Sequence, residues 1–432
     1  MLQLDYCVVG GGIVGLAIGA ALSSMGSVAV LERGPRLIQE TSSRNSGVVH
    51  SGLYYPADSL KTQLCMAGNA NIWRLQRRFP DLIRARRIGK WIGACDAAEA
   101  STLEDLTQKM RQRDIPYELI SAAMARREEP LLQMHTIVNS TSTGIVDVHS
   151  LADFYQGVVE QSSEGYVLCD SEVTRVDLPA GYPCRADTPP IRVMVGKTGD
   201  RDGEAYTVGV RRAVVCAAGL HANVLWSRMC CDGTPLRPPP THRLYACKGR
   251  YAGYRGAPPL SRLVYPCPLP NLVGLGVHSV VDMAGHLRFG PDATYVDDFE
   301  DVRVAQNPLD EQVFLDGQHA AVRRYVPSIQ RERMFADFAG IRPKLAAAGD
   351  EFRDFLIEAI DGVRDGGASA GEPVMQPVTL GGVQASGNPT VVWVNGIESP
   401  GLTASSAIAD LIASWLAGPE QRARKPALWS EE

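Results

Sequence analysis

The stretch that decides the fold is residues 6–32, YCVVGGGIVGLAIGAALSSMGSVAVLE. An apolar strand precedes Gly10, Gly12 and Gly15, which have G-x-G-x-x-G spacing, and a small-residue helix, a second strand and Glu32 follow. In a βαβ unit the first glycine allows a tight turn, the second lets backbone approach a pyrophosphate, and the third lets helix and strand pack closely. The stretch predicts a dinucleotide-binding unit, with phosphates at the helix N-terminus and a ribose hydroxyl at Glu32.

A membrane span is the alternative interpretation of this stretch, because no charged residue occurs between Asp5 and Glu32. Its glycines, and the turn at residues 23–26, would interrupt such a span. The nucleotide-binding interpretation is favoured because strand, glycines, helix, second strand and acid occur together, whereas a glycine triplet alone is a weak signal.

Composition narrows the class of protein. A chain of 432 residues with 45% hydrophobic residues can bury a large core, and its net charge of −5 gives no basic footprint for nucleic acid. The ten cysteines lack C-x-x-C pairs and indicate reduced core residues of an intracellular protein rather than a metal site. The first strand begins almost at Met1, so no signal peptide is expected within this sequence, and the C-terminal residues do not resemble a peroxisomal address.

The pattern of strands predicts that the chain leaves the nucleotide domain and returns to it. Residues 212–219 and 391–395 are expected to form buried strands of that domain, and a helix is expected from about residue 401 to Leu416. Residues 235–326 are rich in prolines, aromatics and alternating strands, which is typical of a mixed or antiparallel sheet.

Three smaller features are also predicted. Ser150 is expected to cap a helix over residues 151–162, and residues 167–176 are expected to form one strand. The Gly, Ala and Asp content of residues 361–372 indicates a flexible insertion. The polar loop over residues 44–56 is too polar for a core strand and is expected to line a site.

Seven blocks of sequence together resemble the L-2-hydroxyglutarate dehydrogenase family, within the D-amino acid oxidase and glycerol-3-phosphate dehydrogenase group of flavoproteins. The blocks span nearly the whole chain, and their combination is far more restrictive than the glycine fingerprint. They are RNSGVVHSGLYYP (44–56), SLK (59–61), TGIVDVHSL (143–151), GLGVH (274–278), RFGPD (288–292), GIRPK (340–344) and GIESPGLTAS (396–405).

The resemblance implies a mixed α/β and α+β chain with a Rossmann-like FAD-binding domain assembled from discontinuous segments. It also implies a substrate domain built on a mixed or antiparallel sheet over the isoalloxazine ring. The expected boundaries are 1–90, 145–222 and 336–432 for the FAD domain, and 91–144 and 223–335 for the substrate domain. Long insertions at residues 178–204 and 361–388 depart from the family pattern and leave surface contacts and oligomeric state open.

The resemblance also implies which residues contact FAD. Gly401, Leu402 and Thr403 begin a helix whose N–H groups are expected to face the pyrimidine side of the flavin, although simple capping by Ser399 or Thr403 is equally compatible with the sequence. Val173 is expected to meet the adenine through its backbone, and Ala218 and Gly219 to pass near the pyrophosphate. The full expected set is Gly10, Gly12, Gly15, Glu32, Arg33, Arg44, Asn45, Ser46, Val173, Ala218, Gly219, Gly340, Gly401, Leu402 and Thr403.

His50 and His278 are the candidates for the base that takes the hydroxyl proton while a hydride leaves the carbinol carbon. Each lies in one of the family blocks, and a structural role is the alternative for either one. His278 is slightly favoured because a strand of the substrate domain would carry it opposite the flavin ring. His50 has a second interpretation, a covalent bond to the flavin methyl group, as in related flavoproteins.

A substrate with two carboxylates needs cationic partners. Arg342, followed by Pro343 and Lys344, is the expected anchor because guanidinium binds carboxylate through two hydrogen bonds. Lys61 and Tyr54 are weaker candidates for the distal carboxylate, with Arg44 behind them, and exposed salt bridges are an equally good explanation of these residues. Two cations in a dry pocket would select a dicarboxylate over a lactate-like acid.

The resulting expectation is FAD-dependent oxidation of L-2-hydroxyglutarate to 2-oxoglutarate, with electrons passed to a quinone-linked or other acceptor. A related oxidase that uses oxygen on another 2-hydroxy acid or a small amine is one alternative, and a flavin-binding protein without turnover is another. No transmembrane segment is expected, and peripheral contact with a membrane is compatible with the sequence. A mitochondrial location is expected if a presequence has been removed, and otherwise a cytoplasmic or membrane-peripheral one.

Overall fold

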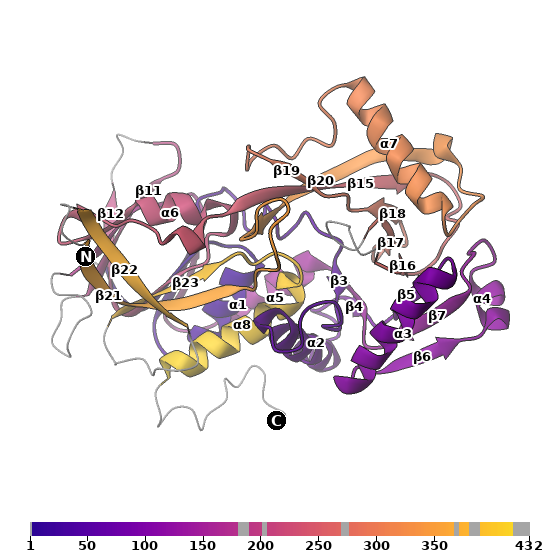
Figure 1. Cartoon of the computed structure of the whole chain (residues 1–432). Helices are drawn as coiled ribbons and strands as arrows, with labels where there is room; N and C mark the ends of the chain where they lie inside the picture. Colours follow the sequence, from indigo (N-terminus) through magenta and orange to yellow (C-terminus); the bar gives the residue numbers. More distant parts are fainter. Residues whose placement is uncertain are drawn as a thin grey trace. The chain divides into compact units, whose positions relative to one another are not determined.

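The computed structural model describes residues 2–179, 190–200, 205–268, 276–366, 371–379 and 389–417, with the backbone alone for 361–366 and 371–379. The chain divides into two compact units. Unit 1 comprises residues 1–43, 148–245 and 343–432, and unit 2 comprises residues 44–147 and 246–342. Each unit therefore combines segments that are far apart in the sequence, as the colours of Figure 1 show.

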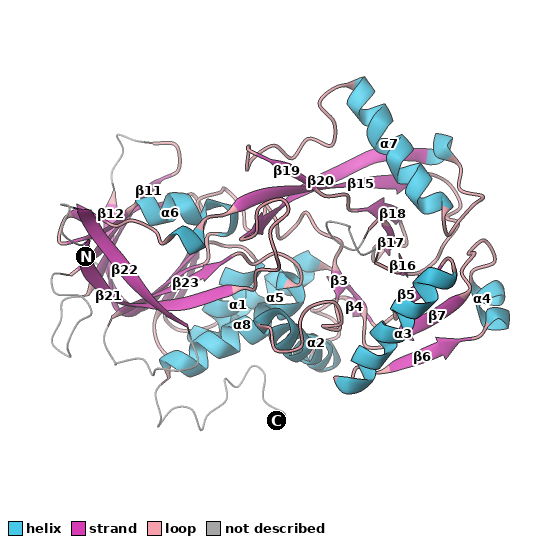
Figure 2. Cartoon of the chain, viewed as in Figure 1, coloured by secondary structure: helices cyan, strands magenta, loops and turns pink. Residues whose placement is uncertain are grey.

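Unit 1 is built on a large sheet with helices beside it (Figure 2). Its strands are β1 (Leu2–Val9), β2 (Val28–Leu31), β9 (Gly165–Leu168), β10 (Ser171–Leu178), β11 (Ile191–Lys197), β12 (Tyr206–Cys216), β13 (Met229–Cys231), β14 (Thr234–Pro235), β21 (Leu356–Gly366), β22 (Gly371–Thr379) and β23 (Thr390–Asn395). Its helices are α1 (Ile13–Leu22), α5 (Val148–Glu160), α6 (Ala222–Ser227), α8 (Gly401–Leu416) and the 3-10 turns η1 (Gly219–His221) and η2 (Pro240–His242).

The centre of this sheet is parallel. β1 lies between β2 and β12, with Tyr6 opposite Val28 on one side and Ala213 on the other. β9 pairs with β2 in parallel, and β23 pairs in parallel with the second half of β12. Strands covered on both faces need continuous apolar runs, which β1 and β2 supply after Asp5. The predicted returns of the chain at residues 212–219 and 391–395 thus lie in the same sheet as the first strand.

Helix α1 explains the hydropathy that resembled a membrane span. It packs against both α5 and α8, and nearly all of its residues are buried. A helix that is apolar on all sides can be the interior of a large protein as well as a membrane segment. Within the described part of the chain, none of the helices has the length and apolar character that a membrane crossing requires.

Unit 2 contains three smaller sheets. The strands are β3 (Val48–Val49), β4 (Ala85–Arg86), β5 (Trp91–Ala94), β6 (Tyr117–Ile120), β7 (Thr136–Ser140), β8 (Gly144–Val146), β15 (Tyr245–Tyr254), β16 (Val264–Pro266), β17 (His278–Val281), β18 (Leu287–Gly290), β19 (Thr294–Val296) and β20 (Met334–Lys344). The first sheet has the order β17-β18-β15-β19, and β20 also pairs with β15. The second sheet has the order β16-β5-β7-β6, and the third has the order β3-β8-β4. The helices are α2 (Leu60–Arg78), α3 (Ala97–Gln112), α4 (Ala122–Glu128), α7 (Pro308–Arg323) and the 3-10 turn η3 (Arg331–Arg333).

Two hydrophobic clusters make the core of unit 2. One gathers Trp91, Phe289 and Phe314, and the other gathers Tyr251 and Tyr265 with apolar residues of α3. Both clusters contain residues of β5, β16 or β17, so these strands run through the middle of the unit. Side chains at the ends of these strands are therefore held by a packed core.

Three local predictions are corrected by the structure. Ser150 lies inside α5, which begins at Val148, so it does not precede that helix. The single strand expected over residues 167–176 is two strands, separated at Asp170, whose φ of 50° is incompatible with an extended strand. The expected flexible insertion at 361–372 contains the ends of β21 and β22, which pair antiparallel because backbone hydrogen bonds do not require apolar side chains.

The unit boundaries also differ from the expected domain boundaries. Residues 44–90, 145–147 and 336–342 belong to unit 2 rather than to the nucleotide-binding unit, and residues 223–245 belong to unit 1. The loop and helix over 44–90 contact β8 and the core of unit 2, which no local sequence signal reveals. Of the insertion at 178–204, residues 180–189 and 201–204 lie outside the described residues, as do 269–275 with the start of the GLGVH block.

Candidate active site and nucleotide site

The glycine turn of unit 1 has the shape that a pyrophosphate needs. Gly10 has a φ of 115°, a backbone conformation that side chains rarely adopt, and a Cβ there would overlap the carbonyl of Ala217. A Cβ on Gly15 would overlap the carbonyl of Gly10, so α1 and β1 can approach only because residue 15 is glycine. Gly12 is the N-cap of α1 and provides no side-chain cap to its N–H groups. The residues present therefore fit a bound phosphate group.

Glu32 is fixed at the end of β2 by backbone donors. The N–H of Gly11 donates to Oε2 of Glu32 at 2.8 Å, and the N–H of Gly34 donates to Oε1 at 2.7 Å. Each carboxylate oxygen retains a second lone pair, which a ribose hydroxyl can use. The acid thus lies beside the glycine turn, as its sequence separation predicts.

Arg33 contacts the side chain of Glu40, whereas the preceding residue, Glu32, accepts hydrogen bonds from the backbone. Its guanidinium lies 2.8 Å from Oε1 of Glu40, and Nε2 of His221 lies 2.8 Å from the same oxygen. Burial by itself would raise the pKa of Glu40, but the hydrogen bonds and charges of His221 and Arg33 outweigh it and lower that pKa. A role of Arg33 in cofactor binding stays a prediction.

Three other residues of the expected cofactor set also lie in unit 1. Ala218 and Gly219 follow Ala217 into η1, and Gly219 has a φ of 52° with open space where a Cβ would lie. Val173 is buried in β10 opposite Val195. Its carbonyl accepts a hydrogen bond of 2.6 Å from Arg228, so this oxygen already has a protein donor.

The N-terminus of α8 is the second helix end in unit 1. Pro400 is its N-cap and gives no side-chain cap, and Gly401, Leu402 and Thr403 form the first turn. The carboxylate of Glu398 just before this turn pairs with Lys344 at 2.8 Å. Lys344 therefore belongs to unit 1 and has an acidic partner there, and its expected role as a carboxylate anchor stays a prediction.

Four further residues of the expected cofactor set lie in unit 2. A Cβ on Gly340 would overlap the carbonyl of Arg44, so the glycine lets the loop at Arg44 approach β20. Asn45 accepts from the N–H of Gly47 at 2.9 Å, and Ser46 hydrogen-bonds Tyr251. These residues form a polar loop against a strand, as the composition of residues 44–56 indicates.

Unit 2 also holds a buried cluster of titratable side chains. His278 begins β17, and its ring stacks on that of Tyr265 with centroids 3.7 Å apart. The Nζ of Lys90 lies 4.5 Å from the ring centroid of Tyr265 and 4.5 Å from that of Tyr54. His50 belongs to the same cluster, because the charge of Lys90 acts on both histidines. The two predicted histidines are thus brought together, although 227 residues lie between them in the sequence.

The backbone fixes how His278 is presented. Its Nδ1 lies 3.0 Å from the carbonyl oxygen of Gly276, which can only accept, so the ring hydrogen is on Nδ1 and the lone pair is on Nε2. The next residue, Ser279, accepts from the N–H of Val264 at 2.7 Å and donates to the carbonyl of Arg262 at 2.9 Å. Ser279 therefore ties β17 to β16 and holds His278 against Tyr265.

Both histidines are uncharged at neutral pH. Burial, with the charges of Lys90 and His278 acting in the same direction, lowers the pKa of His50 to about 3. Burial likewise lowers the pKa of His278 to about 3, with Lys90 and Arg342 acting in the same direction against the hydrogen bond to Gly276. A neutral imidazole with a lone pair on Nε2 can accept a proton, which is what a general base requires.

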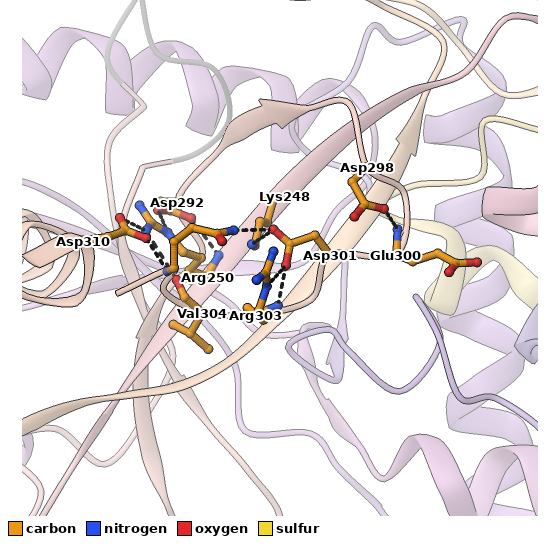
Figure 3. Close-up of polar contacts among 10 residues, drawn as sticks. Lys248, Arg250, Asp292, Asp298, Glu300, Asp301, Arg303, Val304 and Asp310 are labelled. Carbon is orange, nitrogen blue, oxygen red and sulfur yellow. Dashed lines mark hydrogen bonds and ion pairs between the residues drawn. The ribbon is translucent and has the colours of Figure 1, made fainter. Parts of the chain in front are cut away.

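Arg342 is held by backbone rather than by an acid. Its guanidinium donates to the carbonyls of Cys247 and Lys248 at 3.3 Å each and to that of Asp292 at 2.6 Å. The carboxylates around it have other partners: Figure 3 shows Arg250 with Asp292 and Asp310, and Lys248 with Asp301. Within the described residues no carboxylate pairs with Arg342, so its positive charge is available to an anionic ligand.

The weaker candidates also lie in unit 2. Lys61 is buried in α2, and its Nζ lies 5.8 Å from the ring centroid of Tyr55. The hydroxyl of Tyr54 is buried without a hydrogen-bond partner among the described residues. Arg113 holds the loop that carries Tyr54, donating to the carbonyls of Gly52, Leu53 and Tyr55.

Lys90 and Tyr265 were not predicted from the sequence. Lys90 is 1% exposed and directly precedes β5, and the hydroxyl of Tyr265 is buried without a described partner. One signal could have pointed to the lysine: it is the single charge in the apolar run IGKWIGA over residues 88–94. No local signal marks Tyr265, because its neighbours in the cluster come from other strands.

Comparison with known proteins identifies the family of the chain. The family described as DAO, FAD dependent oxidoreductase, matches residues 5–415. The mitochondrial L-2-hydroxyglutarate dehydrogenase of Arabidopsis thaliana is 30% identical over 95% of this chain and 83% of its own length. The L-2-hydroxyglutarate dehydrogenase of Escherichia coli is 27% identical over 67% of this chain and 64% of its own length.

Solved structures show the same fold. FAD-bound L-alpha-glycerophosphate oxidase from Mycoplasma pneumoniae superposes with a TM-score of 0.72 at 22% identity, covering 97% of this chain and 96% of the other. Glycine oxidase from Geobacillus kaustophilus superposes with a TM-score of 0.66 at 21% identity, covering 96% and 95%. The fold is thus the mixed α/β fold of these flavoproteins, and the glycine turn, Glu32 and the helix N-termini fit FAD as the cofactor. The chain belongs to the DAO family of FAD-dependent oxidoreductases.

Proposed function

We propose that this enzyme oxidises L-2-hydroxyglutarate to 2-oxoglutarate. The observation that carries the proposal is the buried cluster of unit 2, in which a neutral histidine lies among positive charges. Such a site suits an anionic hydroxy acid that must lose a proton. The relatives named L-2-hydroxyglutarate dehydrogenase support the same substrate.

The cofactor and the protein have different roles in this reaction. When bound, FAD accepts the hydride that leaves C2 of the alcohol. The chain's own residues bind the acid, orient its hydroxyl and take the hydroxyl proton. We assign the proton to Nε2 of His278, because its other ring nitrogen is engaged with the carbonyl of Gly276.

The low pKa of His278 is that of the protein alone, and it is expected to change when an acid binds. Besides burial, part of the lowering comes from the positive charges of Lys90 and Arg342. An anionic acid beside these cations offsets their effect on the imidazole and raises its pKa. His278 therefore becomes a better proton acceptor when the substrate is present.

Arg342 is proposed to bind the C1 carboxylate. Three backbone carbonyls orient its guanidinium without neutralising its charge, so the arginine is prepared for an anion. Leaving such a partner unpaired is costly in a buried site, which favours acids that carry this carboxylate.

The electron acceptor is proposed to be a quinone-linked carrier rather than oxygen. The names of the relatives, which are dehydrogenases, support this choice. An oxidase that uses oxygen on another 2-hydroxy acid or a small amine is the competing function, and it predicts stoichiometric peroxide in air. His50 keeps its second assignment, a covalent link to the flavin, which predicts a yellow pellet after acid precipitation.

Anaerobic bleaching of the flavin absorbance at about 450 nm tests the proposal. L-2-hydroxyglutarate should bleach the band rapidly, whereas the D isomer and L-lactate should not. Bleaching by an amine or by glycerol phosphate, but not by L-2-hydroxyglutarate, would contradict it. If no compound bleaches a protein that is yellow, a flavin-binding protein without turnover is the better description.

A further inference from the structure

Lys90 is a buried cation that the assignments above leave without a role. Only 1% of the residue is exposed, and no carboxylate pairs with its ammonium in the part of the chain that the structure describes. Lysines are almost never fully buried unless they are paired, because a charged ammonium loses its hydration. A lysine in this position needs an anion, which the described residues do not provide.

The surroundings of Lys90 fit an anion. The faces of the Tyr54 and Tyr265 rings lie against its Nζ, and both rings carry buried hydroxyls without a described partner. Ring faces stabilise a cation but cannot satisfy its N–H donors. An ammonium and two tyrosine hydroxyls all have hydrogens to donate, which is the donor set that a carboxylate accepts.

The place of Lys90 relative to His278 indicates which carboxylate it receives. The ring of Tyr265 contacts both residues, stacking on the imidazole and facing the ammonium. His278 is assigned to the 2-hydroxyl of the substrate. Lys90 lies against the same Tyr265 ring as His278, so it suits a group at the other end of the substrate's carbon chain. Arg342 is already assigned to the C1 carboxylate, next to the hydroxyl. The C5 carboxylate is therefore the one left for Lys90.

We propose that Lys90, with the hydroxyls of Tyr54 and Tyr265, binds the distal carboxylate of a dicarboxylic 2-hydroxy acid and so sets the specificity of the enzyme. This proposal rests on the proposed function and names the residue that distinguishes a dicarboxylate from a lactate-like acid. It replaces Lys61 as the partner of that carboxylate and keeps Tyr54.

The test compares wild type, Lys90→Met and the control Lys109→Met, all loaded with FAD. Lys109 lies on α3 of the same unit and is exposed, so the control removes a lysine without touching the cluster. Binding of glutarate and of propanoate is measured from the change in the flavin absorbance spectrum. Neither acid has a hydroxyl to oxidise, so both report on binding alone.

We expect Lys90→Met to weaken glutarate binding by roughly 100-fold to 1,000-fold, because one carboxylate loses its buried cation. Propanoate binding should stay within about threefold, and Lys109→Met should match wild type for both acids. Equal weakening of both acids, or no weakening of glutarate, would overturn the proposal. A large fall in kcat with unchanged glutarate binding would make Lys90 a base and would also overturn it.

The thermal midpoint of the apoprotein separates a binding role from a structural one. Methionine has nearly the length of the lysine stem and no charge to bury, so Lys90→Met should unfold at the same or a higher temperature. A lower thermal midpoint of Lys90→Met would mean that the ammonium stabilises the fold through the tyrosine rings. That result would contradict a role of Lys90 in binding a ligand.

Failure of this proposal can be distinguished from failure of the proposed function. If wild type binds glutarate through Lys90 but L-2-hydroxyglutarate does not bleach the flavin, the site stands and the reaction is wrong. If L-2-hydroxyglutarate bleaches the flavin of wild type and Lys90→Met still prefers glutarate, the reaction stands and the role of Lys90 is wrong.

Discussion

At the residue scale, the site depends on side chains whose protonation is set by burial. His278 is neutral because burial lowers its pKa to about 3, and its backbone hydrogen bond leaves Nε2 as the acceptor. Lys90 is the only member of the cluster with a pKa near neutral, since burial lowers it to about 7. The charge of the described cluster around neutral pH is therefore controlled by one lysine.

His278→Gln should lower kcat by roughly 100-fold to 10,000-fold, the usual contribution of a general base. FAD and glutarate should still bind, because neither cation is removed. His286→Gln is the matched control, since His286 lies on the exposed turn between β17 and β18 and pairs with Asp282. Steady-state kinetics and flavin absorbance measure both; an unchanged kcat in His278→Gln would move the base to His50.

The apoprotein should become more stable as the pH rises from 7 to 8.5, through Lys90. Its pKa is about 7 in the fold and about 10.4 in an unfolded chain, so between these values the unfolded state binds more protons. The slope of this dependence is up to about 1.4 kcal/mol per pH unit, and it falls to zero well below pH 7, where both states are protonated and the buried ammonium destabilises the fold most.

Lys90→Met is the reference for this measurement. The other groups that sense Lys90 do not change charge in the fold over this range, because the pKa values of His50 and His278 are lowered to about 3 and that of Cys65 is raised to about 12. The difference in thermal midpoint between Lys90→Met and wild type should shrink between pH 7 and 8.5. A constant difference would show that Lys90 keeps an ordinary pKa.

At the scale of elements, β1, α1 and β2 form a unit whose geometry depends on glycine. Gly15→Ala should abolish FAD binding and destabilise the protein by about 1–3 kcal/mol, because its Cβ would overlap the carbonyl of Gly10. Gly157→Ala is the control: Gly157 lies in α5 with open space at its Cβ position, and alanine there should stabilise by about 0.5–1 kcal/mol.

Flavin content after purification and the thermal midpoint measure both glycine variants. Retention of FAD by Gly15→Ala would contradict the close approach of helix and strand at this turn. Loss of FAD in Gly157→Ala would show that the assay reports general damage rather than the turn.

At the scale of the whole molecule, cofactor chemistry and acid binding are assigned to different units. The glycine turn and the N-terminus of α8 belong to unit 1, whereas His50, Lys90 and His278 belong to unit 2. Hydrogen exchange should therefore show FAD protecting residues 10–15 and 401–404 most strongly. Glutarate should protect residues 50–54, 88–92 and 276–281 instead, because it binds in the cluster.

Mass spectrometry of exchanged peptides from apoprotein, FAD-loaded protein and FAD-loaded protein with glutarate provides the measurement. Acetamide at the same concentration is the control, since it lacks the charge that Lys90 and Arg342 recognise. Protection by glutarate confined to unit 1 would contradict the assignment of the acid site to unit 2.

Local sequence alone determined the nucleotide-binding unit, and it named His50 and His278 as candidates for the base. The glycines, the strands and Glu32 occur within about 30 residues, so local spacing carries the physical requirement. Arg342 could also be named as a candidate, since a guanidinium in a block resembling known enzymes is a good carboxylate partner.

The residues proposed for the acid site come together only in the tertiary structure. Lys90, Tyr265 and His278 are distant in sequence and meet because β16 pairs with β5 and Ser279 ties β17 to β16. Whether a cation is neutralised is equally a tertiary matter: Lys344 meets Glu398, whereas Arg342 meets carbonyls and Lys90 meets rings. Charge, burial and partners depend on contacts between strands, and no local pattern of residues encodes them.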